Sequence, residues 1–167
     1  MLGPAKLLAF CGLALVANTA RGQGLPATIQ GTLKENGAPI VDAAVFLQSF
    51  DNEECAKLFT NRNWNQMSAE KLAAKLRSCT HDVGTTTVDP TGKYRFTDLK
   101  AGWYAVHFLW NIAEKPKRFP DSSKEGDWLV MYAGYKDSTG KYDTMAQDVP
   151  FRFSGNEDVI RDFSGRH

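Results

Sequence analysis

Residues 85–106 read TTTVDPTGKYRFTDLKAGWYAV, and this stretch decides the fold. Asp89-Pro90-Thr91-Gly92 has the composition of a tight turn, because proline presets its own φ and glycine accepts a positive φ. After this turn Tyr94 and Phe96 alternate with polar residues, the period of a strand with one buried face. A second reversal at residues 100–102 precedes another alternating run over residues 103–112. The stretch therefore predicts three short strands joined by two turns.

Strand signals continue on both sides of this meander, as alternating residues or as short apolar runs rich in strand formers. A charged loop is expected at residues 114–127 and a turn-rich connection at residues 133–142. About seven short strands with frequent turns predict an all-β sandwich. The further strands are expected at residues 29–33, 43–50, 127–132, 149–153 and 159–163. Its core is expected to contain Ile29, Leu33, Val45, Leu47, Tyr94, Phe96, Tyr104, Val106 and Phe108.

The N-terminus has the pattern of a secretory signal. Residues 1–6 form a short basic segment, residues 7–16 an apolar run, and Ala20-Arg21-Gly22 a small-x-small cleavage site. The apolar run is too short to cross a bilayer, which needs roughly 20 apolar residues. We expect a signal peptide over residues 1–22 and one secreted or periplasmic domain over residues 23–167. A lipoprotein signal at Cys11 is the competing interpretation, although Cys11 comes early and follows a bulky residue.

Removal of the signal peptide leaves two of the three cysteines, Cys55 and Cys79. In an oxidising compartment an even pair predicts a disulfide bond, and two independent buried thiols are the alternative. The remaining chain has 18 basic and 19 acidic side chains, a net charge near −1. It contains no run of basic residues, so nucleic acid is not an expected partner, and the chain is not expected to span a membrane.

The strand alternation stops between residues 51 and 79, where good helix formers appear. Asp51 or Asn52 can cap a short helix, and Ser68 can cap a second helix over residues 69–78. This pattern predicts a helical hairpin inserted into the sandwich and tied by the Cys55–Cys79 bond. Because function on rigid scaffolds tends to lie in their variable connections, we expect the insert to carry the specificity of the protein. The apolar residues expected on one face of the second helix are Leu72, Leu76 and Cys79.

A spaced set of turn and core residues runs through residues 27–112. It consists of Gly31, Gly37, Pro39, Ala43-Ala44-Val45, Leu47, Thr87, Asp89, Gly92, Tyr94, Phe96, Leu99, Gly102, Tyr104 and Val106. This set resembles the carboxypeptidase regulatory-like domain, a transthyretin-like sandwich related to the Cna B-type repeats of surface proteins. The resemblance implies an Ig-like or prealbumin-like β-sandwich and says little about function. The helical insert and the charged loop at residues 114–127 depart from the family pattern.

Enzymes built on sandwiches of this kind have recognisable residues. Hydroxyisourate hydrolases carry a His-x-Asp-x-Arg motif and a Tyr-Arg-Gly-Ser ending, which this chain lacks. Intradiol dioxygenases hold iron with two tyrosines and two closely spaced histidines, whereas His81, His107 and His167 lie far apart in the sequence. No nucleophile motif or metal-ligand spacing is present either. We therefore expect no catalytic residue, no metal site and no cofactor.

Aromatic residues are the remaining indication of a ligand. Trp64, Trp128 and Tyr135 fall on loops, strand ends or strand faces that alternate away from the expected core. Exposed aromatic side chains serve sugar stacking or protein contacts, and the alternative is that these residues fill a second core layer. We expect a non-enzymatic binding or structural module that contacts a protein or envelope component at a cell surface. The alternative is a carbohydrate-binding module that uses these aromatic residues.

Overall fold

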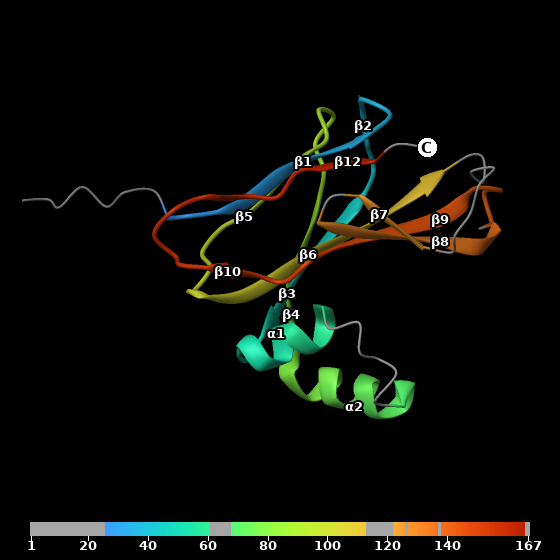
Figure 1. Ribbon diagram of the computed structural model, residues 1–167. Helices are drawn as coiled ribbons and strands as arrows, with labels where there is room; N and C mark the ends of the chain where they lie inside the picture. Colours follow the sequence, from blue (N-terminus) through green and yellow to red (C-terminus); the bar gives the residue numbers. More distant parts are fainter. Residues whose placement is uncertain (1–25, 61–67, 113–121, 126, 137, 166–167) are drawn as a thin grey trace, which may run out of the picture.

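The structure is a computed structural model that describes residues 26–60, 68–112, 122–125, 127–136 and 138–165. For residues 69, 122–125 and 132–136 it describes the backbone alone. Two β-sheets pack face to face, and two helices lie on the outer side of the larger sheet (Figure 1). The predicted all-β sandwich with an inserted helical hairpin is confirmed. No helix in the described part of the chain has the length and apolar character needed to cross a bilayer.

The smaller sheet is built around β1 (Ile29–Glu35). The short strands β11 (Val159–Ile160) and β12 (Phe163–Gly165) run parallel to β1 along one edge. The strands β5 (Lys93–Phe96) and β2 (Ala38–Pro39) pair with it in antiparallel fashion. The first and the last described strands of the chain therefore lie side by side.

The larger sheet is antiparallel, with β6 (Gly102–Ile112) near its centre. One half of β6 also pairs with β10 (Phe151–Phe153). In spatial order its strands are β4 (Thr80–Thr87), β3 (Ala44–Phe50), β6 (Gly102–Ile112), β9 (Tyr142–Asp148), β8 (Trp128–Lys136) and β7 (Ser122–Glu125).

Two expected connections contain strands. The charged loop expected at residues 114–127 includes β7, and the turn-rich connection expected at residues 133–142 is shortened by β8 and β9. The reason for missing β9 is its composition, because the residues that face the core are small or polar and leave no hydrophobic alternation. These inward residues are Thr144, Ala146 and Asp148, all of them buried.

Aromatic side chains dominate the core between the two sheets. The ring of Phe108 is fully buried, and its centroid lies 4.8 Å from Trp110, 5.5 Å from Trp128 and 5.0 Å from Phe163. The contacts with Trp128 and Phe163 are edge-to-face, a geometry that adds to the stabilisation from buried area. The nine residues that the sequence placed in the core are all buried, so that prediction is confirmed.

Acidic side chains attach the C-terminal strands to the smaller sheet. Asp158 accepts hydrogen bonds from both the backbone amide and the hydroxyl of Thr28, each at 2.8 Å. Asp162 accepts the amide of Thr32 at 2.7 Å. The hydroxyl of Tyr94 donates to the carbonyl oxygen of Arg161 at 2.7 Å, and burial raises the pKa of this tyrosine. The smaller sheet is therefore held by side chains as well as by its short ladders.

The predicted turn at residues 89–92 is organised by Asp89. Its carboxylate accepts the backbone amides of Thr91 at 2.8 Å and Lys93 at 3.0 Å. Gly92 has a φ of 79°, as its place in the turn requires. The second reversal is expected at residues 100–102, but the positive φ of 58° there belongs to Asp98 and not to Gly102. An aspartate can adopt this left-handed conformation because its short polar side chain can form local hydrogen bonds.

Substitution of Gly92 by alanine should destabilise the protein more than the same change at Gly37. Both glycines have positive φ, so each variant should lose about 1 kcal/mol from backbone strain alone. A Cβ atom at Gly92 would also lie 2.6 Å from the carbonyl oxygen of Leu33, whereas one at Gly37 would meet no atom within 4 Å. Urea denaturation of the two variants measures the difference. Equal losses would show that the close approach at Gly92 costs nothing.

Candidate functional site

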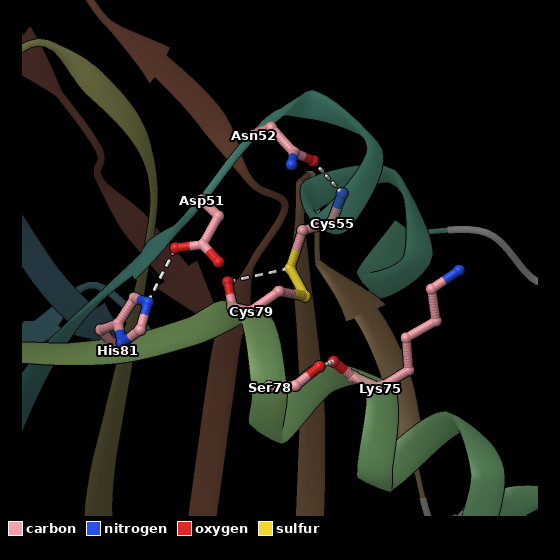
Figure 2. The surroundings of a disulfide bond; sticks show 7 residues. All are labelled: Asp51, Asn52, Cys55, Lys75, Ser78, Cys79 and His81. Atoms are coloured by element: carbon pink, nitrogen blue, oxygen red, sulfur yellow. Dashed lines mark hydrogen bonds and ion pairs between the residues drawn. A yellow bond between two sulfur atoms is a disulfide. The ribbon is translucent and has the colours of Figure 1, made fainter.

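The helical insert is the connection between the neighbouring strands β3 and β4. Residue 50 pairs with residue 80, and the amide of Asp51 donates to the carbonyl oxygen of Cys79 at 3.0 Å. The predicted Cys55–Cys79 disulfide is confirmed, with Cα atoms 6.2 Å apart. Figure 2 shows this bond beside the point where the chain leaves and re-enters the sheet. The two ends of the insert are therefore fixed to each other and to the strands.

Both helices begin at residues that the sequence indicated. The side-chain oxygen of Asn52 accepts the amide of Cys55 at 3.0 Å and caps α1 (Glu53–Thr60) (Figure 2). The hydroxyl of Ser68 accepts the amide of Lys71 and caps α2 (Ala69–Cys79). Such caps stabilise short helices that bury little apolar surface of their own.

The insert packs on the outer face of the larger sheet. Phe50 and Ala105 from the sheet form a second apolar cluster with Cys55 and Ala56 from α1. The ring of Phe59 meets that of Phe50 edge-on, with centroids 5.4 Å apart. The insert therefore covers one end of this face and leaves the rest of it open.

A groove of about 440 Å³ lies between the insert and the uncovered part of the sheet. This volume is within the range typical of binding sites, roughly 300–1,000 Å³. Helix α1 contributes Phe59 and Thr60, and α2 contributes Leu76. Strands β8 and β9 and the segment after β9 supply the other side. The apolar side chains of the lining are Phe59, Leu76, Leu129, Met131, Val149 and Pro150.

Further apolar residues continue across the same sheet face. Leu109 on β6 is 42% exposed and Leu129 on β8 is 40% exposed, although large aliphatic side chains usually lie inside. Met145 faces Leu109 and Met131 across the ladder and is half-buried. Methionine side chains are flexible and suit surfaces that adapt to a partner. Leu109 and Met145 do not line the groove.

His107 stands on this face beside the groove. Its ring stacks on Phe46 with centroids 5.1 Å apart and an interplanar angle of 8°. Burial lowers the pKa of His107 below its usual value, and the carboxylate of Asp82 opposes the shift. The neutral imidazole is therefore the form that the folded protein favours.

Acidification should destabilise the protein partly through His107. As the pH falls through about 6.5, the unfolded chain takes up the proton before the folded protein does, so stability is lost from that pH downward. His107→Gln should show a smaller loss than the wild type between about pH 8 and about pH 5. Urea denaturation at both pH values measures the loss of stability in each protein. Comparing the two losses removes the contribution of the carboxyl groups, which is common to both proteins. The same loss in both proteins would contradict the prediction.

A charged cluster borders the groove at the end of β9. Arg161 donates two hydrogen bonds to the carboxylate of Asp148, one of them from Nε at 2.6 Å. Its Nη2 lies 3.5 Å from a carboxylate oxygen of Asp127, and its guanidinium carbon lies 5.0 Å from the ring centroid of Phe151. The bonds with Asp148 raise the pKa of Arg161, so the guanidinium stays charged.

The structure does not bring the predicted ligand-binding aromatics together. Trp128 is only 3% exposed, and its indole NH donates to the carbonyl oxygen of Asp162 at 2.9 Å. The prediction that Trp128 points away from the core is wrong, because the register of β8 places it on the inner face beside Phe108. Trp64 and the side chain of Tyr135 lie outside the described residues.

The groove itself was not predicted. Of its lining residues, the sequence predicts Leu76 on the apolar face of the second helix and Trp128 only as an exposed aromatic residue. Among the described residues, no three His, Cys, Asp or Glu side chains are grouped so that they could hold a metal ion. Comparisons of the chain with models of protein families, with curated proteins and with solved structures found no match. The resemblance to the carboxypeptidase regulatory-like domain therefore stays a prediction.

Proposed function

We propose that this protein is a non-enzymatic, secreted or periplasmic module that binds another protein at the envelope or cell surface. The observation that carries the proposal is the apolar groove between the helical insert and the outer face of the larger sheet. Protein partners bury apolar side chains in well-packed pockets of this kind. The groove, and not the sheet face beside it, is the proposed contact.

The insert supplies one side of this site and the sheet supplies the other. Phe59 and Leu76 come from two short helices, whereas Leu129 and Met131 come from a strand that is paired on both sides. The disulfide holds the helices in register with the strands. Binding residues on connections that a rigid scaffold positions are common in β-sandwiches.

Export is supported by the disulfide and by the N-terminal pattern. Disulfide bonds persist mainly in oxidising compartments. The apolar run at residues 7–16 with its small-residue cleavage site is typical of a secretory signal. The carbohydrate-binding alternative loses its support from Trp128, and no feature of the described residues favours it.

Two matched leucine variants test the site. Leu129 lies in the groove and Leu109 lies on the same sheet face outside it, and their exposed fractions are nearly equal. We expect the intact protein and Leu109→Glu to capture the same partner from the native envelope or secreted fraction, and Leu129→Glu to lose it. Quantitative mass spectrometry of the captured proteins measures this loss. Equal capture by both variants would exclude the groove as the contact.

Removal of the insert tests whether the sandwich folds without it and whether the insert is needed for binding. Residues 52–78 can be replaced by a short Asn-Gly turn because residues 51 and 79 are already hydrogen-bonded neighbours. We expect a folded β protein, judged by circular dichroism, that no longer captures the partner. A variant that fails to fold would show that the insert belongs to the core. The Leu129→Glu variant would then be the remaining test of the proposed function.

A further inference from the structure

The groove has an acidic border that is not fully neutralised. Asp148 is completely buried and bound by Arg161, whose side chain is 19% exposed. Asp127 is one of the residues that line the groove, and its side chain is 66% exposed. Two carboxylates thus share one guanidinium, and the excess negative charge lies on the exposed Asp127.

The rest of the described lining offers no compensating cation. The lining consists of apolar residues together with the neutral polar residues Thr60 and Gln147 and the pair of aspartates. Lys75 and Arg77 flank Leu76 on α2 but are exposed and do not line the groove. Asp127 therefore sits at the boundary between an apolar surface and water, where a cation can reach it.

We propose that the groove receives a segment of the partner protein that presents apolar side chains next to a lysine or an arginine. This inference rests on the proposed function and specifies the chemistry of its partner. The apolar side chains would contact Phe59, Leu76 and Leu129. The basic group would pair with Asp127, and its aliphatic stem would cover part of the apolar lining. Charge complementarity at the edge of an interface sets the orientation and the association rate more than the affinity.

The effect of Asp127 on affinity is expected to be small and measurable. Its exposure makes the pair resemble a surface ion pair, worth about 0.2–1 kcal/mol. Asp127→Asn should then weaken a basic, apolar peptide up to about fivefold and reduce the salt dependence of its binding. The Arg161–Asp148 pair remains intact in this variant, so the fold is not affected.

Selection of peptides from a random heptapeptide library displayed on phage provides the test. The intact wild-type protein is the target, and Asp127→Asn, Asp143→Asn and Leu129→Glu are selected in parallel. Asp143 is the matched control because it lies on β9 outside the groove lining. Titration calorimetry of the enriched peptides at low and high salt then gives the affinities.

We expect peptides that combine apolar residues with lysine or arginine from the wild type and from Asp143→Asn. The basic preference should disappear with Asp127→Asn, and Leu129→Glu should not enrich these peptides. Apolar peptides without a basic preference, or a preference unchanged by Asp127→Asn, would overturn this inference and leave the proposed groove standing. Peptides enriched equally by Leu129→Glu, or no enriched peptides, would count against the groove itself.

Discussion

Replacement of Asp148 by alanine should lower the free energy of unfolding by about 3 kcal/mol, because it leaves a half-buried guanidinium without its main partner. Arg161 makes both of its close carboxylate contacts with Asp148, while Asp127 lies 3.5 Å away and is largely exposed. The backbone of Arg161 is also fixed, since its amide donates to Gln30 at 2.9 Å. The side chain is only 19% exposed, so its charge is largely removed from water. Urea denaturation measures this loss in the free energy of unfolding, because urea adds no salt that would screen the charges.

A double variant separates the free energy that the ion pair contributes to stability from the free energy lost when one charge is left unpaired. Replacing both partners by apolar residues of similar size, Asp148→Leu with Arg161→Met, should cost less than Asp148→Ala alone, because a buried pair often has little net value. A loss of less than about 0.5 kcal/mol in the single variant would mean that Arg161 finds solvent or Asp127 easily.

Removal of the disulfide should cost about 3 kcal/mol, the chain-entropy value for a closed loop of this length. The bond joins residues 24 positions apart and fixes both helices to the β3–β4 pair. The variant Cys55→Ala with Cys79→Ala should therefore show a lower urea midpoint. Cys55 is buried in the apolar cluster under the insert, so alanine is a better replacement than serine.

Two measurements complement this prediction. Intact mass with and without reductant should differ by two hydrogens in the exported wild-type protein. Limited proteolysis should cleave the insert of the variant faster than the sheets, because its helices are too short to persist alone. An unchanged midpoint together with unchanged proteolysis would show that packing on Phe50 and Ala105 suffices to hold the insert.

The sequence predicted the parts of the fold where periodicity and packing agree. Tyr94, Phe96, Tyr104 and Val106 alternate in the sequence and are all buried, so one face of each strand could be assigned. The helical insert could be predicted because the period changes at residue 51 and Ser68 supplies a cap. The strand β9 could not, because Thr144, Ala146 and Asp148 face the core while the more apolar Met145 faces outward.

The candidate site was harder to predict because its residues come from separate segments. Phe59, Leu76, Leu129 and Pro150 come together only after the insert has packed on the larger sheet. Trp128 shows a related difficulty, because the sheet face on which a side chain lies depends on the register of its strand. Its burial follows from Phe163 on β12 of the other sheet and from the carbonyl of Asp162, which directly precedes β12. No local pattern contains that information.

The side-by-side position of β1 and β12 sets the order in which the chain can fold during its synthesis. Leu33 pairs with Phe163, and Thr28 is held by Asp158, so one edge of β1 is completed only by partners made 130 residues later, whereas β5 pairs with the other edge earlier. The larger sheet and the insert can form earlier, because β3, β4 and β6 are nearer in sequence. Pairings of such long separation close slowly. The smaller sheet can therefore be completed only after residues 158–165 have been made, so the last steps of folding close the core between the two sheets.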